Sequence, residues 1–153
     1  MKTHILCLGD SNTHGYCADP KDNADGGIRF NEDERWTCRL QTALGDKYLV
    51  TEEGLSGRTT VFVDPIHESM DALSVAYPLL KSHEVIDLLI IMLGTNDNGM
   101  NAEDFISNYT ALVQAIQASY PYTDIIVNTV PPVPSNHSNY PNMDQTRIDD
   151  FNM

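Results

Sequence analysis

The sequence predicts an α/β fold built on a parallel sheet. Short apolar runs alternate along the chain with segments whose apolar residues recur at helical spacing. The runs at 5–8 and 85–93 are too continuously apolar for strands with one exposed face, which is typical of parallel strands covered on both sides. Alternating strands and helices connect by right-handed crossovers, so the carboxyl ends of the strands should share one edge of the sheet.

The first half of the chain supplies two strands and one well-marked helix. Residues 5–8 predict a buried strand that Gly9 ends. Residues 31–34 resemble a capping box ahead of a helix over 36–44, in which Trp36 is expected to anchor the core. Residues 48–50 predict a second strand.

The second half repeats the alternation. A helix is predicted within 69–83, with a kink or a new helix at Pro78 because proline cannot continue a helix undisturbed. Residues 85–93 predict a central strand. Asn101 is expected to cap the next helix, Pro121 to stop it, and a fourth strand and the start of a further helix are predicted at 125–127 and 144–153.

Composition excludes several classes of partner. The chain of 153 residues has a formal net charge of −13 and a pI near 4.4, which argues against nucleic acid and anionic membrane surfaces as partners. Its three cysteines have no spacing typical of a disulfide framework or a zinc site, so we expect no metal, no cofactor and a reducing, cytoplasmic location. We find no convincing targeting signal and no segment that could span a membrane.

Ligands of a parallel α/β sheet bind at the carboxyl ends of its strands. The loops expected there span 9–12, 54–60, 94–99 and 131–142. The first carries Ser11 on a sharp turn between strand and helix, a position that exposes a hydroxyl at the sheet edge. The long loop at 12–31 follows it, and long loops in compact domains are often functional.

This edge could supply part of the machinery of a serine esterase. Such an enzyme needs a nucleophile, a base with a group that orients it, and donors for the oxyanion. Ser11 can attack, and its own N–H, the N–H of Gly57 and the Asn96 side-chain amide can donate. Taken singly, Ser11 could be a turn or helix-cap residue, Gly57 a turn glycine, and Asn96 an Asx-turn or helix-cap residue.

The same three segments resemble a known family, the SGNH or GDSL hydrolases. Gly9-Asp10-Ser11 is similar to the family's first block, the segment 54–60 to the second, which supplies an oxyanion glycine, and Gly94-Thr95-Asn96-Asp97 to the third, which supplies an oxyanion asparagine. The resemblance runs to about Pro134 and is strongest to the arylesterase and acyltransferase branch.

The resemblance implies a three-layer, flavodoxin-like α/β/α fold and a hydrolase of small acyl esters that forms an acyl-enzyme on Ser11. It also implies Gly57 and Asn96 as oxyanion donors, a small-molecule ester as substrate, and a homo-oligomer. We expect Asp10, Asn12, Thr95 and His137 to line the substrate pocket.

The family's fourth element is an Asp-x-x-His near the C-terminus that supplies the base, and no such pair occurs after Asn96 in this sequence. We therefore expect one domain over 1–153 that lacks its C-terminal strand and helix and has impaired activity. His137 is the best replacement base by position, whereas a satisfied or solvated role is expected for His4, His14, His67 and His83.

Two other functions stay open on the sequence alone. Glycine-rich loops at strand ends could bind the phosphate of a nucleotide or flavin, although no Gly-x-Gly-x-x-Gly follows the first strand. A sheet missing one edge would leave an unpaired strand and bare apolar surface, as in a non-catalytic partner of a larger assembly.

Overall fold

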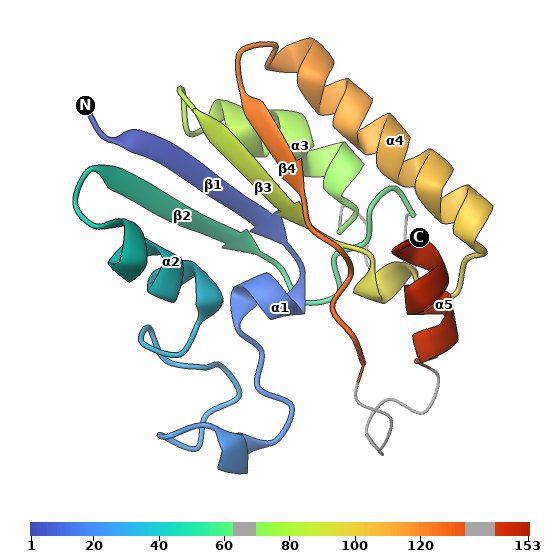
Figure 1. Cartoon of the computed structure of the whole chain (residues 1–153), viewed down its shortest axis with the longest axis horizontal. Helices are drawn as coiled ribbons and strands as arrows, with labels where there is room; N and C mark the ends of the chain where they lie inside the picture. Colours follow the sequence, from blue (N-terminus) through green and yellow to red (C-terminus); the bar gives the residue numbers. More distant parts are fainter. Residues whose placement is uncertain (63–69, 134–142) are drawn as a thin grey trace.

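The computed structural model describes residues 1–62, 70–133 and 143–153. Its sheet contains β1 (Thr3–Gly9), β2 (Tyr48–Gly54), β3 (Leu88–Met92) and β4 (Asp124–Val127). The strands lie in the order β2-β1-β3-β4 and every neighbouring pair is parallel, as Figure 1 shows. Gly9 pairs with both Gly54 and Met92, so β1, β2 and β3 end level with one another and release their following loops at one edge.

The helices connect these strands. They are α1 (Ser11–His14), α2 (Trp36–Leu44), α3 (Ala72–Lys81), α4 (Ala102–Ser119) and α5 (Gln145–Phe151), with short 3₁₀ turns at Pro20–Asp22 and Thr95–Asp97. Within the described part of the chain, none of the helices combines the length and hydropathy that crossing a bilayer requires.

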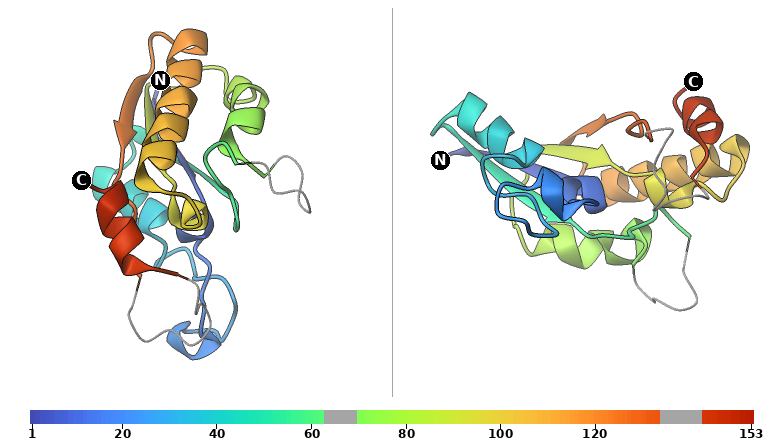
Figure 2. Two further views of the ribbon diagram at one scale, coloured as in Figure 1. Left: turned by 90° about the vertical axis from the view of Figure 1, so that its right-hand side faces the viewer. Right: turned by 90° about the horizontal axis from the view of Figure 1, so that it is seen from below.

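Helices cover both faces of the sheet and give the predicted three layers. Side chains alternate along β1, so that Ile5 and Cys7 pack on the side of α2, while Leu6 and Leu8 pack in the larger core with α3 and α4. Figure 2 shows α2 and α3 on opposite sides of the strands. Trp36 packs against the smaller cluster, as expected for a core anchor.

Two local predictions differ in part from the structure. Of the two outcomes expected at Pro78, the new helix does not occur, because α3 runs through Pro78 as one helix. Ser74, whose carbonyl loses its helical partner there, is exposed, so water can satisfy that oxygen. Asn31 does not cap α2, whose N-cap Arg35 makes no side-chain bond, and the Glu34 carboxylate instead accepts from the Asn31 N–H at 3.1 Å in a preceding turn.

Candidate active site

A cavity of about 390 Å³ opens at the edge where the strands end. The loops that follow all four strands contribute to its lining, as the sequence predicted for this edge. It is lined by Ser11, Asn12, Tyr16, Ala18, Ser56, Gly57, Thr95, Asn96, Pro131, Pro132, Val133 and Met143. The three segments singled out in the sequence therefore meet at one void, and none of the described lining side chains carries a charge.

Ser11 is the first residue of α1 and follows β1 through a turn that Asp10 holds. The Asp10 carboxylate accepts hydrogen bonds from the Asn12 N–H at 2.9 Å and from the Asn12 side-chain amide at 3.0 Å. Asp10 is fully buried, and this burial raises the pKa of its carboxyl above the usual value although the bonds from Asn12 lower it. Asp10 thus lies beneath the cavity as an N-cap rather than on its wall.

The turn at Ser11 packs tightly on β2. A Cβ atom at Gly54 would overlap the backbone of His14 in α1, so only glycine allows this approach. Asn12 also reaches the third loop, because its side-chain amide donates to the Thr95 hydroxyl at 3.3 Å. Asn12 and Thr95 both line the cavity, whereas His137 lies outside the described residues.

Gly57 lies in the turn after β2 with a φ of +85°, which favours glycine. An added Cβ would lie 2.9 Å from Met70 Cε. Asn96 lies in the 3₁₀ turn after β3, and its side-chain Nδ2 donates to the main-chain carbonyl of Arg58 at 2.9 Å. An amide nitrogen carries two hydrogens, so this bond orients Asn96 while leaving one donor unused by it.

Sequence reasoning missed the residues that hold these loops together. Arg58 is buried and donates from Nη1 to the carbonyl oxygens of Gly9 at 3.1 Å and of Glu53 at 2.6 Å. Asp97 is buried against Thr60, and burial raises the pKa of its carboxyl even though both Thr60 donors lower it. These contacts leave no spacing signal in the sequence, because Arg58 lies 49 residues from Gly9 and Asp97 lies 37 residues from Thr60.

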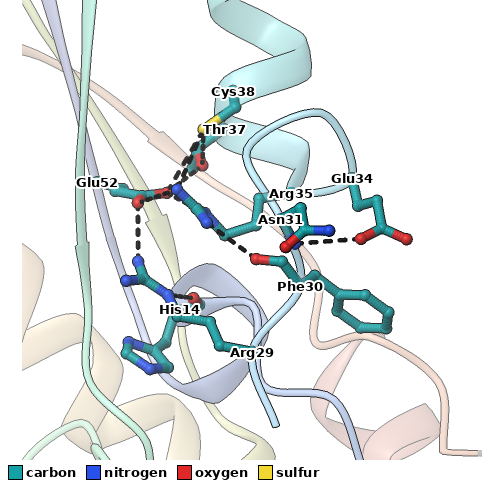
Figure 3. A network of polar contacts seen from close by, with 9 residues as sticks. All are labelled: His14, Arg29, Phe30, Asn31, Glu34, Arg35, Thr37, Cys38 and Glu52. Carbon is teal, nitrogen blue, oxygen red and sulfur yellow. Dashed lines mark hydrogen bonds and ion pairs between the residues drawn. The ribbon is translucent and has the colours of Figure 1, made fainter. Parts of the chain in front are cut away.

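A second network holds the loop that carries Tyr16 and Ala18, and Figure 3 shows it. Arg29 and Arg35 both pair with the Glu52 carboxylate, at 2.9 and 3.0 Å, and Thr37 donates to it at 2.6 Å. Arg29 also donates to the carbonyl of His14 at the end of α1. Burial raises the pKa of Glu52, but the bonds from Thr37 and Arg35 and the nearby arginine charges outweigh it, so the pKa is lowered.

Helix α5 supports the wall formed after β4. The Asn152 side chain donates to the Val130 carbonyl at 2.9 Å and accepts from the Val130 N–H at 2.8 Å. Gln145 accepts from the Val133 N–H at 2.6 Å. Ile148 and Phe151 are buried beneath, so the last helix docks on the core and fixes the segment at Pro131 and Pro132.

No histidine lines the cavity within the described ranges 1–62, 70–133 and 143–153. The His4 ring contacts the Val85 carbonyl and the Thr51 hydroxyl, which is the satisfied role expected for it. The His83 ring packs edge-on against the His4 ring and contacts the Glu53 carboxylate at 2.8 Å, so it too has the satisfied role expected for it. His67 lies outside the described residues, as His137 does.

Comparisons with known proteins agree with the fold. The chain resembles the native aryl esterase of M. smegmatis at 33% identity and a TM-score of 0.85, over 99% of this chain and 76% of that one. Est24, a carbohydrate acetylesterase from Sinorhizobium meliloti, is 29% identical with a TM-score of 0.85, over 98% and 76%. A lipase/acylhydrolase from Enterococcus faecalis, 23% identical with a TM-score of 0.64 over 99% and 67%, shares the fold.

No significant match is found among curated protein sequences. The sequence does match the profile of the GDSL-like lipase/acylhydrolase family over residues 7–153, nearly its whole length. This match favours an ester hydrolase over the nucleotide-binding alternative. The chain belongs to the GDSL-like lipase/acylhydrolase family, whose substrates are small-molecule esters.

Proposed function

We propose that this chain acts on small, neutral acyl esters through an acyl-enzyme on Ser11, with slow turnover in the absence of a histidine base. The observation that carries the proposal is that Ser11, Gly57 and Asn96 line one cavity. The absence of charge among its described lining side chains suits an uncharged ester. The aryl and carbohydrate acetyl esters named for the structural neighbours are candidate substrates.

The chemistry follows from the groups at the cavity. The Ser11 hydroxyl attacks the carbonyl carbon of the ester, and the carbonyl oxygen becomes the oxyanion of a tetrahedral intermediate. The N–H groups of Ser11 and Gly57 and the second hydrogen of the Asn96 amide are the proposed donors to that oxyanion. One such donor typically contributes about 3–4 kcal/mol of transition-state stabilisation. Collapse of the intermediate expels the alcohol and leaves the acyl group on Ser11.

The proposed limit on turnover is proton transfer. Ser11 must lose its proton on attack, and water must lose one in deacylation, and both steps ordinarily use a histidine. After Asn96, no histidine of this sequence follows an aspartate at the Asp-x-x-His spacing, and the pair that has this spacing, Asp64 and His67, precedes Asn96 in the chain. Loss of a triad member costs on the order of 10⁴- to 10⁶-fold in rate, so we expect weak hydrolysis.

Hydrolysis of p-nitrophenyl acetate tests the proposal. The purified chain should turn over slowly, Ser11→Ala should lower that rate further, and Ser74→Ala, on the exposed side of α3, should leave it unchanged. Fusion of a C-terminal segment bearing Asp-x-x-His from a related esterase should raise the rate, and only when Ser11 is intact. An ordinary enzymatic rate in the unextended chain would refute the missing base, and equal rates for wild type and Ser11→Ala would refute the nucleophile.

The remaining proposals concern location and assembly. Cys7, Cys17 and Cys38 are free thiols, which suits a cytoplasmic location. The family resemblance supports a homo-oligomer, and the net charge of −13 supports the absence of a nucleic-acid partner. Light scattering of the purified protein measures its oligomeric state, and a monomer across micromolar concentrations would refute the homo-oligomer.

A further inference from the structure

The Arg58 guanidinium lies where β1 and β2 end. Its Nη1 donates to the carbonyls of Gly9 and Glu53, at 3.1 and 2.6 Å. Gly9 stands two residues before Ser11, and Glu53 is the residue before the last of β2, which leads into the turn at Gly57. A single side chain therefore joins the backbones that carry the proposed nucleophile and one proposed oxyanion donor.

The main chain of Arg58 reaches the other donors. Its N–H donates to the Leu55 carbonyl at 3.0 Å and closes the turn that contains Gly57. Its carbonyl accepts from the Asn96 side-chain amide at 2.9 Å. A shift of Arg58 would consequently move the Gly57 N–H and release the orientation of Asn96 together.

Burying a guanidinium at this position costs more free energy than burying an apolar side chain of similar size. Arg58 is only 5% exposed, and a buried charge is unfavourable unless it is hydrogen-bonded and faces opposite charge. Burial lowers the pKa of Arg58, whereas the carboxylates of Glu53 and Asp10 oppose that change and favour the charged form. A methionine would fill much the same volume but could not bond two carbonyls at once.

We propose that Arg58 is a positioning residue, which keeps Ser11, Gly57 and Asn96 in the geometry of the oxyanion site by bonding both strand ends and the Asn96 amide. The inference rests on the proposed function for its chemical consequence, but the geometry it describes can be measured without any reaction.

The variants are Arg58→Met, which removes the donors, and Arg58→Lys, which keeps the charge and a donor group. The matched control is Leu112→Ala, which opens the core at a fully buried residue of α4 that does not line the cavity. Thermal unfolding of all three variants shows how much each loses in stability, so that any common effect of destabilisation can be subtracted.

The first measurement is the Asn96 side-chain amide in ¹H–¹⁵N spectra, identified by its loss in Asn96→Asp. Arg58→Met should shift both amide resonances and speed their exchange with water, because the loop carrying the Arg58 carbonyl is released. Arg58→Lys should shift them less. Leu112→Ala should leave them at the wild-type positions.

The second measurement is the rate at which the neutral diester ethyl p-nitrophenyl ethylphosphonate labels Ser11 and releases p-nitrophenol, followed by intact mass. The phosphoryl oxygen of this probe occupies the oxyanion position. Arg58→Met should label about 10²-fold more slowly, the effect typical of losing one oxyanion donor, and Arg58→Lys should recover part of the rate. Leu112→Ala should label at the wild-type rate.

Unchanged Asn96 resonances and an unchanged labelling rate in Arg58→Met would overturn the proposal and leave Arg58 a stabilising residue only. If Arg58→Met does not fold, Arg58→Lys tests the proposal alone. Wild-type Asn96 resonances and a wild-type labelling rate in Arg58→Lys would also overturn it. If wild-type Ser11 takes no label, the proposed function fails, while the Asn96 resonances still test the role of Arg58.

Discussion

The Asp97 carboxylate accepts hydrogen bonds from both donors of Thr60. The Thr60 N–H lies 3.1 and 3.2 Å from the two carboxylate oxygens, and its hydroxyl lies 2.7 Å from one of them. Both residues are buried. Thr60 follows the turn at Gly57 and Asp97 follows Asn96, so this pair fastens together the two loops that carry the proposed oxyanion donors.

Asp97→Ala should therefore destabilise the fold. The substitution leaves the buried Thr60 N–H without its partner, which costs about 1–3 kcal/mol in the free energy of unfolding. Asp97→Asn, which keeps one acceptor oxygen, should lose less. Urea denaturation followed by circular dichroism measures both, with Asp46→Ala at an exposed position as the control. Equal stability of Asp97→Ala and Asp46→Ala would contradict this role.

Gly57→Ala should reduce the reactivity of Ser11 more than its loss of stability explains. Gly57 has a φ of +85°, which an alanine adopts only with strain, so the backbone that carries its N–H should shift, whereas the Met70 methyl near the added Cβ can move aside. We expect labelling of Ser11 by the phosphonate to slow by about 10- to 100-fold, within the range for a displaced oxyanion donor.

Gly26→Ala is the matched control for that change. Gly26 has a φ of +68°, but a Cβ there would meet nothing within 4 Å, and it does not line the cavity. Its substitution carries a similar backbone penalty of about 1 kcal/mol away from the site. Similar labelling rates for the two variants would show that the Gly57 N–H makes no contribution.

Glu52 should contribute stability that depends on pH. Its pKa is lowered in the folded protein, so its contribution is present above the unfolded pKa of about 4.3 and is lost as the pH falls through the folded value. Glu52→Gln should thus be less stable than wild type at pH 7, by about 1–2 kcal/mol, because charge-assisted bonds from Arg29 and Arg35 are lost. The difference should shrink below about pH 4.

Urea titrations at pH 7, 5 and 3.5 measure this difference, with Glu32→Gln as an exposed glutamate control. A constant gap between wild type and Glu52→Gln over that range would mean that shape, and not charge, sets the role of Glu52. Because the network joins the loop carrying Tyr16 to β2, proteolysis of that loop should speed up in parallel with any loss of stability.

Much of the fold could be predicted from the sequence because apolar patterning is local. The run at 85–93 contains β3, the helix predicted over 36–44 is α2 with the same bounds, and Asn101 caps α4 as expected. The meeting of the loops that carry Ser11, Gly57 and Asn96 followed from parallel strands ending at one edge.

The supports of the site could not be predicted in this way. Arg58 and Glu52 act through long side chains whose direction is set by tertiary packing, and nothing in the neighbouring residues marks their partners. Asp97 entered the sequence analysis only as the last residue of the third block, with no sign of its contact with Thr60. Asn152 bonds the backbone of Val130 from a helix that the sequence indicated only as a start.

The most direct measurement is peptide mapping of the acetyl group after a single exposure to p-nitrophenyl acetate, before deacylation. A serine nucleophile in this cavity predicts one acetyl group per chain, on Ser11, slower to form in Asn96→Ala and absent in Ser11→Ala. Acetyl groups spread over other side chains, with Ser11 unmodified and the same pattern in Ser11→Ala, would contradict the assignment of this site as an esterase.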